Sequence, residues 1–349
     1  MWILAGGSYG TADYFMYNDM YDWSSNITQI SNTEVGFSLL MRTCNQLGLS
    51  FQHFLMLIFA VGLCLVGYII LKFSNTPNRV LAIYFIFTFI INVTQFRQFL
   101  ATAIFVFSFQ YLLSSDRNSN LKYIIGIMLA SSIHFSTIFM LVLLLIKSLN
   151  INKVIVITSI TIFTLGLLNL TYSGGYIISL LEIFDVDLLS KIIRILESSK
   201  NKYPWLLIIR WWVKIIEFFV MFYAIQYFAS KRVRIEKRKL DSAGIKVNSL
   251  NNLNVLITKN NIFMLVLIPL TILSVDIYRI QHMMVIWNYI AISAYFDTNA
   301  NKFTITKNNF YISSALIFFA VWFLRSVVLS NDNINTVFYP LFNNNIFLK

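Results

Sequence analysis

The sequence predicts an all-α polytopic integral membrane protein with about ten membrane crossings, several of them short or broken helices. Of its 349 residues, 58% are hydrophobic and only 12% are charged, and the mean hydropathy is +0.69. Soluble domains carry roughly 25% charged residues, so this composition excludes a large soluble core. The chain is also rich in aromatic residues, with 32 Phe, 18 Tyr and 7 Trp, which suit lipid-facing and interfacial positions.

The order of polar and apolar stretches predicts the membrane segments. Residues 1–50 are polar and aromatic, and we expect an acidic-aromatic periplasmic loop there. The apolar runs that predict crossings are 51–71, 80–92, 99–113, 124–146, 154–172, 205–228, 262–275, 283–296 and 310–329. Between them we expect membrane helices over 51–172, a periplasmic amphipathic segment over 173–204, and further membrane helices over 205–330 with a basic cytoplasmic loop at 229–260. A periplasmic tail follows at 331–349.

Counting basic residues loop by loop gives the expected topology. We assume that the N-terminal segment is outside and that the run 124–146 crosses twice, as a broken pair with its pivot near His134. The cytoplasmic loops then hold 16 of the 27 Lys and Arg residues but 4 of the 15 Asp and Glu residues. This asymmetry agrees with the positive-inside rule. Short or broken helices usually line a cavity, because unpaired backbone is not tolerated against lipid.

Arg97 and Gln98 lie between two apolar runs that contain no charge. An arginine that faces lipid costs a few kcal/mol, so it normally faces a cavity, a partner or a phosphate. The guanidinium fork suits an anion well. We therefore assign Arg97 to a site for a membrane-borne diphosphate; the alternative is an interfacial arginine that reaches the headgroups.

His134 is the second candidate, because it is an ionisable side chain inside a membrane run. It could act as a neutral base or as a donor to a phosphate or a sugar hydroxyl, or it could be a core histidine with satisfied hydrogen bonds. The expected topology places further candidates near the same outer face; they are Asp13, Tyr14, Tyr17, Arg210, Arg279 and His282. Arg279 could instead pair with Asp276, three residues earlier.

Other chemistry has little support in the sequence. Metal-ligand, P-loop, Ser-His-Asp and CxxC patterns are absent, and the two cysteines suggest neither a disulfide framework nor a metal site. We expect no metal and no cofactor. The net charge of +12 is spread over the loops, so it favours contact with a lipid bilayer rather than with nucleic acid.

Four motifs together resemble the EpsG-like branch of the Wzy-type polysaccharide polymerases. They are Asp13-Tyr14-x-x-Tyr17, Glu34-x-Gly36-Phe37, Arg97-Gln98-x-Leu100-Ala101 and Ala130-x-x-x-His134-x-Ser136. The resemblance covers roughly residues 9–150, with a weaker match around Arg279. Members of that family usually have one or two membrane helices before the Asp-Tyr motif, so we expect either a start inside a longer reading frame or a shortened variant.

The resemblance implies an inner-membrane glycosyltransferase with a GT-C-like fold. It would join oligosaccharide repeat units carried on undecaprenyl diphosphate at the periplasmic face, for O-antigen, capsule or exopolysaccharide. A flippase and a chain-length regulator are expected partners. Arg97 and Arg279 would bind the diphosphate, Gln98 would position them, and His134 or Asp13 would activate the acceptor hydroxyl. A lipid-linked oligosaccharide flippase and a membrane acyltransferase remain the alternative functions.

Overall fold

The computed structural model describes residues 1–24, 33–114, 116–171, 248–267, 278–297 and 334–348. Over these residues the chain is helical, and the one strand-like pairing is an isolated bridge between Ser8 and Asn345. The described part contains three helices long and apolar enough to cross a membrane, Phe51–Phe73, Pro77–Thr94 and Phe96–Leu113. The prediction of a helical membrane protein is confirmed; ten crossings and a GT-C-like architecture stay predictions.

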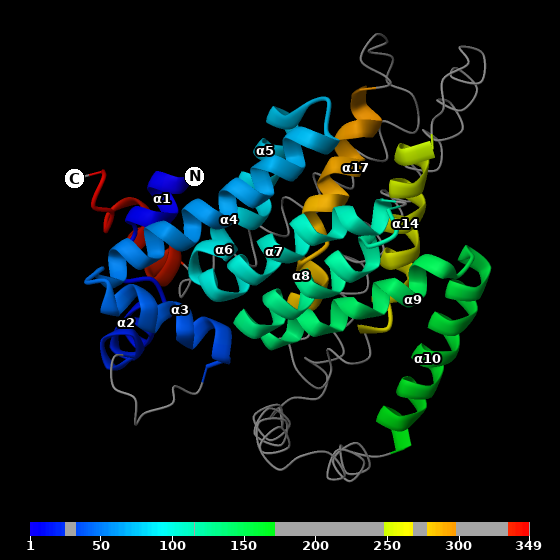
Figure 1. Cartoon of the computed structure of the whole chain (residues 1–349), viewed down its shortest axis with the longest axis horizontal. Coiled ribbons are helices and arrows are strands. Elements are labelled where there is room, and N and C mark those ends of the chain that lie inside the picture. Colours follow the sequence, from blue (N-terminus) through cyan, green and yellow to red (C-terminus); the bar gives the residue numbers. More distant parts are fainter. Residues whose placement is uncertain (25–32, 115, 172–247, 268–277, 298–333, 349) are drawn as a thin grey trace. The chain divides into compact units, whose positions relative to one another are not determined.

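The chain divides into two compact units, Met1–Val142 with Met283–Lys349, and Leu143–His282. The first unit is built around α4 (Phe51–Phe73) and α7 (Phe96–Leu113), which lie side by side (Figure 1). The two helices are parallel, because Phe59 stacks on Phe99 near one end and Lys72 Nζ donates to Gln110 Oε1 at 2.7 Å near the other. Gly62 allows this approach, since a Cβ there would lie 2.7 Å from Cζ of Phe99.

The return from α4 to α7 is one nearly continuous helical run with two irregularities. It consists of α5 (Pro77–Tyr84), the π-helical turn η1 (Phe85–Phe89) and α6 (Ile90–Thr94). Pro77 suits the first turn of α5, where its missing N–H has no partner to lose. The run ends at Gln95, whose φ of −109° and ψ of 49° are not helical, and α7 begins at the next residue.

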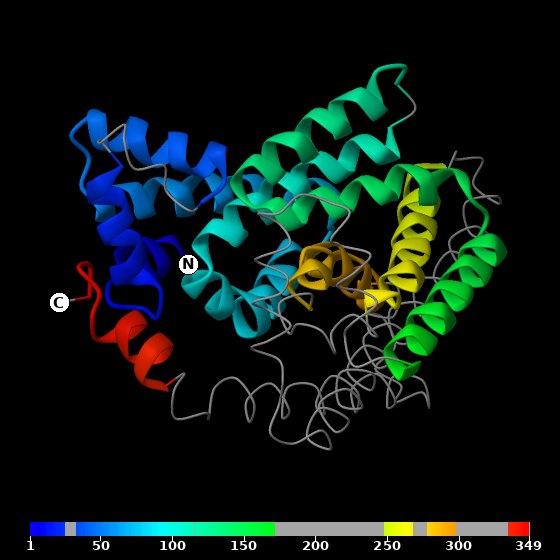
Figure 2. The ribbon, with the colours of Figure 1, turned by 90° about the horizontal axis from the view of Figure 1, so that it is seen from below.

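The predicted break near His134 is present. α8 (Ser119–Ile133) packs antiparallel on α7, and His134 then has an extended backbone with φ −146° and ψ 107°. The chain reverses there, so that the 3₁₀ turn η2 (Phe135–Leu141) runs back along α8 (Figure 2). The hydroxyl of Tyr123 on α8 donates to the carbonyl of Met140 at 2.7 Å and holds the two segments together.

The N-terminal segment, for which we expected an acidic-aromatic loop, contains three helices over its described residues. It forms α1 (Trp2–Gly7), α2 (Tyr14–Trp23) and α3 (Val35–Gln46). Some of the aromatic residues that we assigned to this loop are core residues, since Tyr21 and Phe37 are buried and pack on Phe54 of α4. Helical spacing of these rings gives α2 and α3 a buried face.

The tail of the chain closes on α1, with the two segments adjacent in Figure 1. It contains η5 (Ile334–Phe338) and α20 (Tyr339–Phe342). Asn345 is fully buried, and its Nδ2 donates to the carbonyls of Ile3 and Leu4 at 3.1 Å each. α17 (Val285–Asp297) also belongs to this unit and contacts α4 and α5, where Trp287 packs on Phe73.

The second unit contains α9 (Val142–Ser148, of which Val142 falls in the first unit), α10 (Ile151–Thr171), α14 (Asn248–Met264) and α16 (Tyr278–His282). α14 makes the end of the expected basic loop 229–260 helical, from residue 248 onward. Leu253, Leu256 and Ile257 are buried at helical spacing, and the many asparagines around them hid this pattern. Several predicted features lie outside the described residues. They are the amphipathic segment 173–204, Arg210, the remainder of the basic loop, and the spans 205–228 and 310–329.

Candidate functional site

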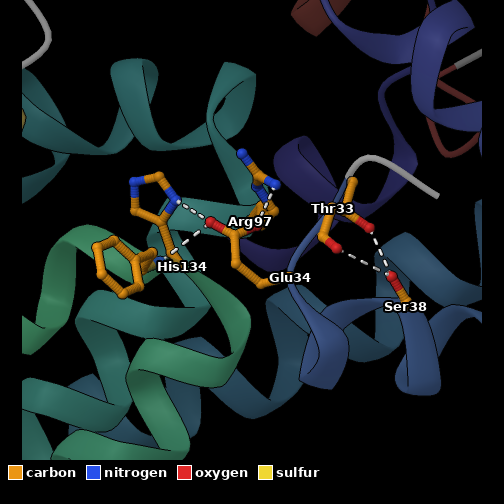
Figure 3. A network of polar contacts seen from close by, with 6 residues as sticks. Thr33, Glu34, Ser38, Arg97 and His134 are labelled. Carbon is orange, nitrogen blue, oxygen red and sulfur yellow. Dashed lines mark hydrogen bonds and ion pairs between the residues drawn. The ribbon is translucent and has the colours of Figure 1, made fainter. Parts of the chain in front are cut away.

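The carboxylate of Glu34 is the centre of a polar cluster in the first unit (Figure 3). Its Oε2 accepts a hydrogen bond from Nη1 of Arg97 at 2.5 Å. Its Oε1 accepts a hydrogen bond from the backbone N–H of Phe135 at 3.0 Å and lies 3.7 Å from Nδ1 of His134. The last distance is that of an ion-pair contact, longer than a hydrogen bond. The side chains of Arg97, Glu34 and His134 are 22%, 24% and 16% exposed.

Each member of the cluster lies where a helix begins or ends. Glu34 is the N-cap residue of α3, Arg97 is in the first turn of α7, and His134 follows the last residue of α8. A carboxylate is favoured at a helix N-terminus, whereas a cation there is disfavoured. The Arg97 side chain therefore gains from a nearby negative charge, and Glu34 supplies it.

Gly36 brings α3 close enough to α8 for this contact. A Cβ at Gly36 would lie 2.8 Å from both the Cβ and the carbonyl oxygen of Ser132 and would also collide with its hydroxyl. Real Cβ atoms do not approach so closely, so only glycine permits this packing. Because Glu34 is two residues before Gly36, the close approach sets how far the carboxylate reaches toward Phe135.

The surroundings of Glu34 keep it ionised. Burial on its own would raise its pKa, but the contact with His134, the N–H of Phe135 and the charge of Arg97 lower it, and the net pKa is about 2. A carboxylate with so low a pKa accepts protons poorly at neutral pH. Glu34 is therefore suited to hold other groups in place rather than to act as a base.

Aromatic rings support the guanidinium of Arg97. Its Cζ lies 5.8 Å from the ring centroid of Tyr17 and 6.0 Å from that of Phe37. Tyr17 in turn packs edge-on against Phe96, at 4.8 Å between centroids. Cation–π contacts of this kind contribute about 0.5–1 kcal/mol each at partly exposed sites, and they restrict the rotamers of the long side chain.

Comparison with known proteins places the whole chain in one family. The model described as the EpsG family matches residues 1–343. The chain belongs to the EpsG family. No curated protein and no solved structure matches it. Membership makes it a membrane protein of polysaccharide biosynthesis.

In this EpsG-family protein, Arg97, His134 and Tyr17 are brought together around Glu34. Gln98 is buried on α7 beside Arg97. Tyr14 lies on α2, and its hydroxyl donates to Gln52 Oε1 at 3.0 Å; burial raises the pKa of Tyr14, so the phenol stays protonated. Asp13 is the N-cap residue of α2. Arg279 and His282 lie on α16 of the second unit, and their roles stay predictions.

Glu34 belongs to the Glu34-x-Gly36-Phe37 motif, but we expected no role for it from the sequence. A signal was present, because Glu34 is the single acidic residue between Asp22 and Asp116 in an EpsG-family chain with 15 acidic residues in all. An isolated acid in a long stretch that also contains an isolated Arg97 suggests a pair. Over the described residues, no group of three or more His, Cys, Asp and Glu side chains is arranged to hold a metal ion.

Proposed function

We propose that this protein is a polysaccharide polymerase that joins oligosaccharide repeat units carried on undecaprenyl diphosphate. The observation that supports it most is the convergence of a cation, Arg97, and an imidazole, His134, on one carboxylate. Transfer from a lipid diphosphate needs a cation for the leaving group and a group that takes the proton of the acceptor. Both kinds of side chain lie around Glu34.

The reaction would proceed in one displacement. An acceptor sugar hydroxyl attacks the anomeric carbon of the donor, the bond from that carbon to the diphosphate oxygen breaks, and undecaprenyl diphosphate leaves. Arg97 stabilises the negative charge that develops on the diphosphate. His134 accepts the hydroxyl proton, with Asp13 as a second candidate for that role. Arg279, Arg210, His282, Gln98, Tyr14 and Tyr17 are the further proposed binding residues.

Charge distribution supports a periplasmic site. The end of the first unit that holds Arg97 and His134 also holds α2 and α3, where the acidic residues include Asp13, Asp19 and Asp22. The other ends of α4, α7 and α8 lie near the basic residues Lys72, Arg79, Arg117 and Lys122. By the positive-inside rule the basic end is cytoplasmic, so the cluster faces outward and the reaction takes place outside the cytoplasm.

The test is a gel of surface polysaccharide from cells that lack this gene and carry the intact chain or a variant. We expect a ladder with the intact chain and a single repeat unit with Arg97→Ala or His134→Ala. Loss of one charge-stabilising donor typically reduces turnover by about 10²–10³-fold. Arg42→Ala and His53→Ala are matched controls, because they remove the same residue types outside the cluster and should leave the ladder intact.

Two results would contradict the proposal. A normal ladder from Arg97→Ala would remove Arg97 from the reaction. Accumulation of lipid-linked units on the cytoplasmic side, with no repeat unit at the surface, would show transport and favour a flippase.

A further inference from the structure

We propose that Glu34 is a positioning residue and shared counterion of the transferase site: it orients His134 and Arg97 and keeps the affinity for the lipid diphosphate low. This inference rests on the proposed function. The inference adds to the proposed function a residue that contacts neither the acceptor nor the donor. It also predicts that loss of this residue has opposite effects on turnover and on binding.

The two carboxylate oxygens have separate partners. Oε2 accepts from Arg97, while Oε1 accepts from the N–H of Phe135 and faces Nδ1 of His134. The hydrogen bond to Phe135 fixes the backbone just after His134, at the point where α8 ends. An imidazole that turns its Nδ1 toward a carboxylate carries the proton on that nitrogen and leaves Nε2 as the proton acceptor. Glu34 is therefore placed to select, once the 3.7 Å gap from Nδ1 closes to a hydrogen bond, the His134 tautomer that can accept a proton from a sugar hydroxyl.

Arg97 is shared between Glu34 and the substrate. A guanidinium has five N–H donors in a planar fork, so one edge can hold Glu34 while another meets a phosphate. Only the Arg97 side chain then separates the negative charge of the Glu34 carboxylate from the bound diphosphate. That repulsion weakens the binding of the diphosphate, and it speeds the release of undecaprenyl diphosphate after each transfer.

Substitutions of Glu34 separate these effects. Glu34→Gln keeps the shape but removes the charge, and its single amide oxygen can replace one of the two carboxylate oxygens that accept from Arg97 and Phe135, but not both. Glu34→Asp keeps the charge but is shorter by one methylene, so it cannot reach both partners at once. We expect a loss of turnover of 10-fold or more in Glu34→Gln and a partial recovery in Glu34→Asp. Asp19→Asn, an exposed acid on α2, is the matched control for loss of a charge.

The second readout is binding of undecaprenyl diphosphate to the purified full chain in detergent. Removal of a like charge about 7 Å from the diphosphate changes the affinity by roughly 10-fold at an effective dielectric of about 20 once partial screening is allowed for. We expect Glu34→Gln to bind undecaprenyl diphosphate more tightly and Arg97→Ala to bind it more weakly. In the Arg97→Ala background, Glu34→Gln should still raise the affinity, because the repulsion between the Glu34 carboxylate and the diphosphate does not need Arg97.

The outcomes separate this inference from the proposed function. If Arg97→Ala and His134→Ala abolish polymer while Glu34→Gln has normal turnover and normal binding, Glu34 has no positioning role and the inference fails alone. Weaker binding in Glu34→Gln, together with lost turnover, would show a merely structural residue and would also overturn it. If all of these variants make normal polymer, the proposed function fails first.

Discussion

Substitution of Gly36 by alanine tests whether the packing of α3 on α8 sets the geometry of the cluster. The added Cβ would lie 2.8 Å from the Cβ and the carbonyl oxygen of Ser132, whereas ordinary contacts are longer by roughly 0.6–1 Å. The backbone oxygen of a helix cannot move aside, so α3 must shift by about that amount. Overpacking of this kind costs about 1–3 kcal/mol.

The same shift separates Glu34 from its partners. The 3.0 Å hydrogen bond from the N–H of Phe135 to Glu34 would lengthen beyond hydrogen-bonding distance. Misplacement of a supporting group by about 1 Å can reduce a rate by about 10²-fold. We therefore expect Gly36→Ala to lower polymer formation per folded molecule by about 10-fold or more, beyond any loss of folded protein.

Two other glycines provide controls. A Cβ at Gly67 meets nothing within 4 Å, so Gly67→Ala should be neutral or slightly stabilising. A Cβ at Gly126 would lie 2.7 Å from Cβ of Ser108, which overpacks α8 against α7 without involving Glu34. Gly126→Ala should lower the melting temperature in detergent as Gly36→Ala does, yet keep its activity per folded molecule.

The assay compares melting temperature with polymer made in membranes, normalised to folded protein. Adding Ser132→Gly to Gly36→Ala removes two of the three clashes, and part of the activity should return. The reasoning is refuted if Gly36→Ala retains full activity per folded molecule. Equal losses of activity in Gly36→Ala and Gly126→Ala would refute it as well, because the effect would then be general.

Three further outcomes are expected. Because the pKa of Glu34 falls from 4.5 to about 2 on folding, wild-type stability should decline as pH falls from 4.5 toward 2. The free energy of unfolding lost in this way is roughly 3 kcal/mol at most. Glu34→Gln should not show this decline when its thermal unfolding is followed at successive pH values. Asn345→Ala removes the buried amide that holds the tail on α1 and should cost about 1–3 kcal/mol, seen as faster proteolysis of the tail. Tyr123→Phe removes the hydrogen bond from the Tyr123 hydroxyl to the carbonyl of Met140 and should cost about 1 kcal/mol, seen as a lower melting temperature.

Local patterns in the sequence were sufficient for the helical class and for the main break. The three apolar runs between residues 51 and 113 became helices with nearly the expected bounds, because length and hydropathy determine a crossing with little help from the remainder of the chain. His134 was expected at a pivot because a topology with one crossing there placed basic loops outside. The described backbone has that pivot.

Longer-range contacts were beyond sequence reasoning. Glu34 is 63 residues from Arg97 and 101 from Phe135, and neither spacing belongs to a local pattern. Polar and aromatic residues before position 50 suggested a loop, since their spacing becomes meaningful only once Phe54 of α4 is known to cover them. The signal that could have been used was charge isolation, because Glu34 is the single acid between Asp22 and Asp116 and Arg97 lies between apolar runs without charge, and such charges are expensive apart and stable together.

The position of the cluster at helix ends explains how a membrane protein can hold three polar groups whose side chains stay partly exposed. A charge in the middle of a span is matched by neighbours on fixed helices and has little freedom to meet a substrate. At the ends of α7 and α8 the backbone supplies its own donors, such as the N–H of Phe135, and the carboxylate of Glu34 satisfies them. The same carboxylate stabilises Arg97 while no substrate is present, so the arginine costs little in the resting protein. In the proposed reaction, a diphosphate that approached from the exposed side would therefore meet a cation that is already oriented and only partly neutralised.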